Sequence, residues 1–321
     1  MKMRHVLFAT TFLICSVPVS QTPVSATRCQ IPVIKEIAIQ EAHCHLNTDE
    51  SGNRGVCCEF SVKISGLKGH KVESCFTPRL LNGSCIKAST YAPASSIDTS
   101  GNLQWRQTMS VQKNLQVVRP AVFVPFKAMR LSDKVENFVI RGHISSGEIS
   151  SYTDFAIQPH HPEQEDINIL LQSIRVEYQE IDLSFPNPSG KSVKTPNFQV
   201  KKRFLLFLSR NRVTSFAPRI LYSGVFFRLP EGGYIFPSSE CPEYNIGPDG
   251  QAQFQKTENV QNLRMERREM HLKVPLNALA IDLSDANRVI AVYYISSDGL
   301  WSVRKFEIMI PDRSELQLIS E

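Results

Sequence analysis

Two stretches of this chain, separated by about 150 residues, resemble one another, and this repetition constrains the fold more than any other feature. Val124-Pro125-Phe126-Lys127-Ala128-Met129 corresponds to Val274-Pro275-Leu276-Asn277-Ala278-Leu279, and Leu131-Ser132-Asp133 corresponds to Leu283-Ser284-Asp285. Further along, Ile144–Gly147 and Phe155–Pro159 correspond to Ile295–Gly299 and Phe306–Pro311. A nearly constant offset over several segments predicts two domains of one fold, related by internal duplication.

Alternation of apolar and polar residues, the pattern of a strand with one wet face, occurs in both halves. Ile34–Ile39 and Phe60–Ile64 alternate in the first half, and Val303–Ile310 alternates in the second. The connecting stretches are rich in Gly, Pro, Ser, Asn and Asp, and no segment carries a long helical stripe. Short strands separated by such turns are typical of β-sandwiches. The sequence therefore predicts an all-β protein with two tandem antiparallel β-sandwich domains.

The segment between the two copies, Gln158–Asp166, contains prolines, adjacent histidines and a run of acids, which do not continue a strand ladder. We therefore place the first domain at residues 27–158, a linker at 159–166, the second domain at 167–311 and a C-terminal tail at 312–321. In architecture this arrangement resembles C2-like or immunoglobulin-like sandwich modules. The second copy has one cysteine, however, and does not match the cysteine pair that brackets a core Trp in immunoglobulin domains.

The amino terminus has the composition of a secretory signal peptide. Lys2 and Arg4 form a charged start, Val6–Val19 is largely apolar, and Val24-Ser25-Ala26 offers small residues to a signal peptidase. The apolar run is about 14 residues long, whereas a membrane-spanning helix needs about 20. We expect cleavage after Ala26, which makes residues 1–26 the signal peptide and the protein secreted, periplasmic or extracellular. No transmembrane segment is expected after cleavage.

Export favours disulfides, because extracellular compartments are oxidising. Hairpin geometry favours closure of Cys75 with Cys85, and of Cys44 with either Cys57 or Cys58. Adjacent residues of a strand point to opposite faces, so one member of the Cys57-Cys58 pair is left to pair elsewhere, for instance with Cys29, or to stay a buried thiol. The candidate disulfide residues are Cys29, Cys44, Cys57, Cys58, Cys75 and Cys85, and Cys241 is the further cysteine outside the leader.

His43-Cys44-His45 contains the ligand types that zinc prefers. In a strand, however, the two histidines share one face while Cys44 takes the other, so the three side chains do not converge. We interpret this segment as a disulfide flanked by exposed histidines, and we predict no metal and no other cofactor. Asp98–Gly101 and Pro248–Gly250 occupy matching places in the two copies, and we interpret both as tight turns rather than calcium sites.

Basic residues gather in the second half, although the formal net charge of +5 is too small to favour nucleic acid as a partner. They form a candidate patch for an acidic polysaccharide, lipid head groups or a partner protein. The alternative is solvated charge at strand ends, which guards sheet edges against aggregation. The residues of this candidate patch are Lys201, Lys202, Arg203, Arg210, Arg212, Arg264, Arg267 and Arg268.

Short sequence signatures of catalysis are missing: the chain has no Gly-x-Ser-x-Gly elbow, no His-Glu-x-x-His motif and no Gly-rich phosphate loop. A catalytic site would be expected as a departure of one copy from the other, and the extra polar residues Glu240–Tyr244 contain no nucleophile with a nearby histidine. No catalytic residue is therefore predicted. Large aromatic side chains dominate core burial, so we interpret Trp105 and Trp301 as core or interdomain packing rather than sugar platforms.

These patterns together predict a non-catalytic binding or structural module. Its partner is unknown, and an envelope or extracellular protein, a glycan or an acidic surface are the candidates. Two alternatives stay open: an exported hydrolase-like enzyme with a site in the interdomain cleft, and a peripheral membrane or glycan binder that uses the basic residues of the second domain.

Overall fold

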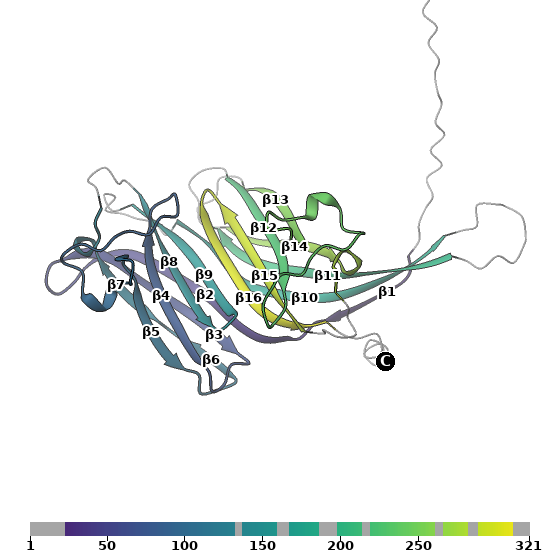
Figure 1. Cartoon of the computed structure of the whole chain (residues 1–321), viewed down its shortest axis with the longest axis horizontal. Helices are drawn as coiled ribbons and strands as arrows, with labels where there is room; N and C mark the ends of the chain where they lie inside the picture. Colours follow the sequence, from purple (N-terminus) through teal and green to yellow (C-terminus); the bar gives the residue numbers. More distant parts are fainter. Residues whose placement is uncertain are drawn as a thin grey trace, which may run out of the picture.

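The computed structural model describes residues 23–131, 137–158, 167–185, 198–213, 219–260, 266–281 and 288–310. Within these ranges the protein consists of strands and four single-turn 3-10 helices, and its sheets are curled and antiparallel (Figure 1). The predicted all-β class is confirmed. The Pro-rich and acidic segment 159–166, the tail 312–321, and most of the expected leader lie outside the described residues.

The first half of the fold follows strand β1 (Pro23–Gln30). It consists of β2 (Val33–Thr48), β3 (Arg54–Ser65), β4 (Lys71–Arg79), the 3-10 helix η1 (Ala94–Ser96), β5 (Trp105–Ser110), β6 (Leu115–Val118), β7 (Ala121–Pro125), η2 (Phe126–Ala128), β8 (Phe138–Ser146) and β9 (Ile149–Ile157). The second half consists of β10 (Ile167–Phe185), β11 (Phe198–Val213), β12 (Arg219–Arg228), η3 (Glu243–Asn245), β13 (Gln253–Val260), β14 (Glu266–Pro275), η4 (Leu276–Ala278), β15 (Arg288–Ser297) and β16 (Leu300–Met309).

Both halves have the same order of elements and the same strand pairings. β3 pairs with β2 and with β6 and β7, as β11 pairs with β10 and β14. β4 pairs with β5 and β8, as β12 pairs with β13 and β15. The repeated Val-Pro dipeptides end β7 and β14, each directly before a 3-10 helix. The repeated Leu-Ser-Asp segments lie largely outside the described residues.

The two halves are joined in one sheet rather than closed around separate sheets. β9 pairs with β16, so an eight-stranded sheet runs β5-β4-β8-β9-β16-β15-β12-β13 through both halves (Figure 1). We call it the shared sheet. This differs from the prediction of two separate modules, because one sheet is common to both halves. The physical reason is that the hairpins β8–β9 and β15–β16 each present a free edge, and pairing the two edges satisfies the hydrogen-bonding groups of both.

A local twofold axis passes through this junction. The β8–β9 turn is closed by Ser146 and Ile149, and the β15–β16 turn is closed in the same way by Ser297 and Leu300. Counted from these turns, Tyr152 of β9 corresponds to Val303 of β16, and these two residues lie opposite each other. On either side of this pair, Thr153 lies opposite Ser302 and Ser151 lies opposite Arg304. Thr153 corresponds to Arg304 and Ser151 corresponds to Ser302, so each of these two pairs is the counterpart of the other. The junction therefore has the geometry of a self-complementary twofold interface within one chain.

Each half has its own buried core, with some exchange across the junction. Phe60 stacks between Phe76 and Phe155 in the first core, at ring-centroid distances of 4.9 Å and 5.5 Å. Phe207 packs against Phe227 and Tyr293 in the second core. Ile290, Val292, Tyr294 and Val303 of the second half belong to the first cluster. The two cores are therefore distinct but not independent.

A buried charge links three strands across the two halves. Arg304 of β16 is 1% exposed, and its Nη1 donates to Glu36 Oε1 of β2 at 2.8 Å. Its Nη2 donates to the carbonyl oxygens of Leu171 and Gln172 in β10, at 2.5 Å and 3.2 Å. Because an unpaired guanidinium at this depth would be costly, the position of β16 is coupled to β2 and β10.

One disulfide joins β2 to β3. Cys44 and Cys58 lie opposite each other with a Cα–Cα distance of 4.3 Å, and both are buried, while His43 and His45 are exposed as strand alternation predicts. The predicted Cys75–Cys85 closure is not formed. Cys85 pairs with Arg79, four residues along β4 from Cys75, which corresponds to roughly 13 Å and exceeds the reach of a disulfide. Within the described ranges, the cysteines outside the disulfide are Cys29, Cys57, Cys75, Cys85 and Cys241.

Strand β1 begins before the expected cleavage site. Pro23–Gln30 pairs with the outer part of β10, and cleavage after Ala26 would leave Thr27–Gln30 opposite Glu180–Glu177. Among the described residues, no helix is long and apolar enough to cross a membrane.

Candidate functional site

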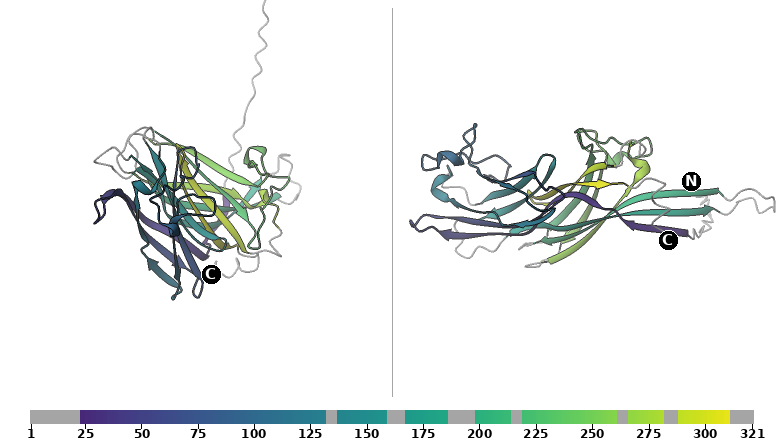
Figure 2. Two further views of the ribbon diagram at one scale, coloured as in Figure 1. Left: turned by 60° about the vertical axis from the view of Figure 1, so that its left-hand side comes forward. Right: turned by 90° about the horizontal axis from the view of Figure 1, so that it is seen from below.

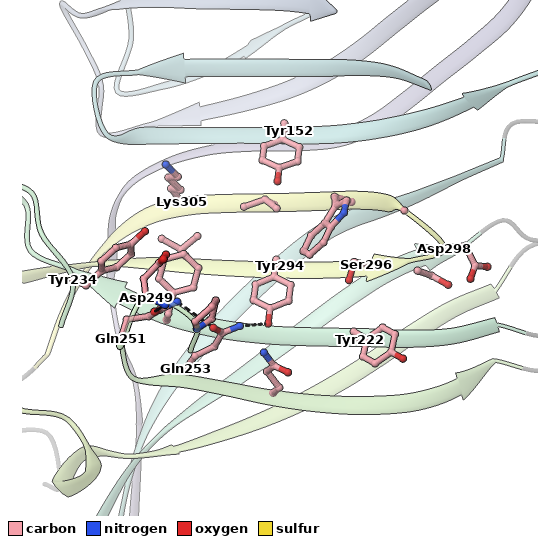
Figure 3. A pocket seen from close by; sticks show the side chains of 18 residues that line it. Tyr152, Tyr222, Tyr234, Asp249, Gln251, Gln253, Tyr294, Ser296, Asp298 and Lys305 are labelled. Atoms are coloured by element: carbon pink, nitrogen blue, oxygen red, sulfur yellow. Dashed lines mark hydrogen bonds between the residues drawn. The ribbon is translucent and has the colours of Figure 1, made fainter. Parts of the chain in front are cut away.

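A concave feature that combines aromatic and polar side chains lies over the shared sheet beside the junction. It is a groove of about 800 Å³, whose floor comes from β9, β12, β13, β15 and β16 and whose wall comes from the loop between β12 and β13 (Figure 3). We call it the seam groove. Its floor is the face of β15 that carries Tyr294 and Ser296, opposite the face whose Tyr293 and Ile295 fill the second core. The loops that contain η1 and η3 stand on the same side of the molecule (Figure 2).

Aromatic rings form much of the groove floor. Tyr294 and Trp301, on adjacent strands, have ring centroids 5.7 Å apart. Trp301 is 37% exposed and Tyr222 is 45% exposed, so both present ring surface to solvent. The aromatic lining residues are Tyr152, Tyr222, Phe226, Tyr234, Tyr294 and Trp301. Most of them carry a polar group on the ring, which lets one side chain stack and hydrogen-bond at once.

A chain of hydrogen bonds orients the polar groups beside these rings (Figure 3). Gln251 Nε2 donates to Gln253 Oε1 at 3.2 Å, and Gln253 Nε2 donates to the Tyr294 hydroxyl at 2.6 Å. The backbone N–H of Asp249 donates to Gln251 Oε1 at 3.0 Å. Burial raises the pKa of Tyr294 and outweighs the opposing hydrogen bonds from Gln253 and Gln255, so the phenol keeps its proton at neutral pH. The hydroxyl therefore retains a proton to donate to a ligand.

Two small residues, Gly224 of β12 and Ser297 of β15, lie at the seam groove. Gly224 lies opposite Tyr294 across the β12–β15 pairing, and a Cβ at this position would lie 2.3 Å from the Tyr294 hydroxyl. Glycine thus allows the tyrosine ring to lie flat over β12. Ser297 at the end of β15 also borders the groove, and strand alternation places its buried side chain on the core side of β15, with Tyr293 and Ile295.

The groove carries little net charge. Its charged lining residues are Lys305 of β16, Asp249 of the β12–β13 loop and Asp298 of the β15–β16 turn. The lining thus contains one cation and two carboxylates, and neither sign of charge dominates.

The corresponding surface of the first half is closed by an ion pair. Strand register places Arg141 where the second half has Val292, and His143 where it has Tyr294. Arg141 Nε and Nη2 donate to Asp154 Oδ1 and Oδ2 at 2.7 Å and 2.8 Å, and the Arg141 guanidinium lies 4.3 Å from the Tyr152 ring centroid. Burial lowers the pKa of His143 to about 4, and the neighbouring cations Lys305, Arg141 and Arg79 add to the effect. The first half therefore has a packed, ion-paired cluster on this face. The second half has the solvent-exposed rings of Tyr222 and Trp301.

The structure separates the predicted basic patch into two groups. Lys202 and Arg210 lie on β11 eight residues apart, which is roughly 26 Å along a strand. Arg210 forms an ion pair with Glu269 at 2.8 Å, and Arg212 Nη2 donates to the Ala42 carbonyl oxygen at 3.0 Å. Lys201, Lys202 and Arg203 form one group, and Arg210, Arg212, Arg267 and Arg268 lie at the other end of β11 and on the paired part of β14. Arg264 lies outside the described residues.

Asp98 and Trp105 have the structural roles that the sequence predicted. Asp98 Oδ1 accepts hydrogen bonds from the backbone of Ser100 and Asn102, so this segment is a tight turn, as predicted. Trp105 packs against the first core, in agreement with the predicted packing role. Trp301 does not: it faces the seam groove. Among the described residues, no group of three or more His, Cys, Asp or Glu side chains is placed to hold a metal ion.

The sequence reasoning missed the residues of the seam groove. The differences between the two copies could have indicated these residues. Trp301 lies where the first half has Ser150, and Tyr294 lies where the first half has His143. Residues that differ between two copies of one fold are not required by the fold. Which of them converge, however, follows only from the strand order.

No protein-family model matches this chain, and no curated protein resembles it in sequence. The functional argument therefore rests on the geometry of the site.

Proposed function

We propose that this protein is an exported, non-catalytic binding protein, built from two duplicated β-sandwich modules, with its ligand site in the seam groove. The identical strand pairings of the two halves and the local twofold axis at Tyr152 and Val303 support a duplication. Each core lies between the shared sheet and a second sheet, formed by β2, β3, β6 and β7 in the first half and by β10, β11 and β14 in the second. This layering supports the sandwich assignment.

Export is supported by two independent features. The first 26 residues have the charged start, apolar run and small-residue site of a secretory leader. The buried Cys44–Cys58 disulfide is the kind of bond that forms and persists in oxidising compartments.

The observation that carries the binding proposal is the contrast between the two halves. On corresponding faces of the shared sheet, the first half carries the ion pair between Arg141 and Asp154, and the second half carries the exposed ring of Trp301 beside Tyr294 and the amides that orient its hydroxyl. Exposed aromatic rings beside oriented amides stabilise the fold poorly. They suit a ligand that covers them.

The proposal is tested by capture of small molecules. The immobilised protein is exposed to a small-molecule extract of its native surroundings, and bound compounds are eluted and identified by mass spectrometry. We expect the unaltered protein and the Tyr244→Ala variant to retain the same compounds. The Trp301→Ala and Gln253→Ala variants are expected to lose them. Tyr244 in η3 is 85% exposed and is not a lining residue of the groove, so it is the matched control.

Two outcomes would contradict this function. Equal capture by the protein and by both groove variants would show that the seam groove is not the binding site. Conversion of a captured compound during incubation would favour the hydrolase-like alternative.

A further inference from the structure

We infer that the ligand of the seam groove is a neutral oligosaccharide, an inference that rests on the binding function proposed above. Three properties of the groove carry it: the exposed ring faces, the oriented amides and the balance of charge.

The exposed rings match one face of a sugar. The face of an aromatic ring carries negative partial charge. The C–H groups on one side of a pyranose ring carry positive partial charge, so a sugar stacks on such a face while its hydroxyl groups point outward to the rim. Trp301 and Tyr222 present ring surface of this kind, and Tyr294 lies between their strands on β15.

The amides match the hydroxyl groups. A glutamine side chain offers both donors and an acceptor, and neighbouring sugar hydroxyls act as donor and acceptor in the same way. The chain from Gln251 through Gln253 to the Tyr294 hydroxyl holds these groups in place before a ligand arrives. Groups that are oriented in advance lose little entropy on binding.

The charge and backbone of the groove disfavour other ligand classes. An anionic ligand is usually held by several Arg or Lys side chains, whereas Lys305 is the one cation among the lining residues and is offset by Asp249 and Asp298. An extended peptide that adds to a sheet needs a free strand edge. β16, β15 and β12, which carry Trp301, Tyr294 and Tyr222, each pair on both sides, so no free strand edge lies beside these rings.

The volume also fits. About 800 Å³ lies within the range of roughly 300–1,000 Å³ typical of small-ligand sites, and the groove is open to solvent. A short oligosaccharide, with some units outside the groove, is the ligand that this shape accommodates.

The test uses immobilised neutral oligosaccharides of glucose, mannose, xylose and N-acetylglucosamine, with polygalacturonate fragments as the acidic arm. Hits are titrated in solution by tryptophan fluorescence. The chain contains two tryptophans, so the Trp105→Phe variant leaves Trp301 as the single reporter. We expect saturable binding of at least one neutral oligosaccharide with a change in Trp301 emission. We expect roughly tenfold weaker binding, by isothermal titration calorimetry, for Trp301→Ala and for Gln253→Ala.

Three controls separate recognition from folding. Trp301→Phe keeps an aromatic face and is expected to restore much of the affinity lost in Trp301→Ala. Tyr244→Ala is expected to bind as the unaltered protein does. Each variant is checked for an unchanged circular dichroism spectrum and melting temperature, so that a loss of binding is not a loss of fold.

The outcomes distinguish this inference from the proposed function. If no neutral oligosaccharide binds, while small molecules are still captured in a Trp301-dependent manner, the ligand class is wrong and the binding function stands. If neither is observed, both are wrong. Oligosaccharide binding that survives both Trp301→Ala and Gln253→Ala would overturn the inference. So would a preference for the acidic fragments that disappears in Lys305→Gln and at high salt.

Discussion

The backbone N–H of Trp301 donates a hydrogen bond to Asp154 Oδ2 at 3.2 Å, across the junction between the two halves. Asp154 is at the same time the bidentate partner of Arg141 in the first half. A carboxylate of one half therefore helps to position the aromatic platform of the other. Because Trp301 lines the seam groove, the arrangement of the groove depends on the junction, although most of its lining residues belong to the second half.

Asp154→Asn is expected to destabilise the protein by about 2 kcal/mol, because it leaves the half-buried charge of Arg141 without a counter-charge. The cost lies below that of a fully buried pair, since Arg141 retains some contact with water. Urea denaturation measures the effect. Glu269→Gln breaks the exposed ion pair with Arg210 and is expected to cost under about 1 kcal/mol. Equal effects of the two substitutions would contradict this interpretation.

Glu36→Gln is expected to cost about 3 kcal/mol or more, because Arg304 is almost completely buried and would lose its carboxylate partner. The matched control is Arg288→Gln, which removes a half-exposed partner of Glu307 and is expected to change stability little. Thermal and urea unfolding provide the comparison. A stable, cooperative Glu36→Gln protein would show that Arg304 is not held as the structure has it.

Replacement of both Cys44 and Cys58 by Ala is expected to destabilise the protein by about 3 kcal/mol, the value for a closed loop of about 15 residues. Treatment of the unaltered protein with a reductant should lower the melting temperature in the same direction. Cys57→Ala is the control, since Cys57 is a half-buried thiol on the other face of β3. If the double replacement is neutral under non-reducing conditions, the disulfide does not stabilise the fold.

Stability is expected to fall as the pH is lowered from 7 to 5. The pKa of His143 is about 4 in the folded protein, against 6.5 as its ordinary value, so the unfolded chain binds more protons within this range. The loss amounts to roughly 2 kcal/mol between pH 7 and pH 5 and continues toward pH 4. In urea titrations at several pH values, His143→Gln should flatten this dependence, whereas His70→Gln at an exposed position should retain it. An unchanged slope in His143→Gln would refute the assignment.

Gly224→Ala is expected to weaken ligand binding by several-fold, because the new Cβ would displace the Tyr294 hydroxyl from Gln253. Tyr294→Phe removes the same hydroxyl without a steric clash and should produce a similar loss in calorimetric titrations. Unaltered affinity in both variants would exclude this hydroxyl from recognition. Weaker binding in Gly224→Ala alone would indicate a displaced ring rather than a lost hydrogen bond.

Local sequence patterns predicted the all-β class and several of the strands and turns. The alternation at His43-Cys44-His45 correctly placed the cysteine inside and the histidines outside, because side chains of a strand alternate whatever the strand packs against. The turn at Asp98 followed from its own side chain, which bonds to backbone groups within four residues. The repeated Val-Pro segments lie at the ends of β7 and β14.

The sequence by itself determined the all-β class, the repetition of one series of segments and the inward side of the strands that alternate clearly, since these depend on residues near one another in the chain. Tertiary structure alone decided that β9 pairs with β16, that Arg304 meets Glu36 268 residues away, and that Tyr222, Gln253, Tyr294 and Trp301 converge on one groove. The residue pattern of β16 does not indicate which of its faces is covered by a second sheet. For this reason the sequence predicted a packing role for Trp301. The physical reason is that edge-to-edge pairing and the register between distant strands are set by the hydrogen bonds and burial of the whole fold, which no short window of sequence contains.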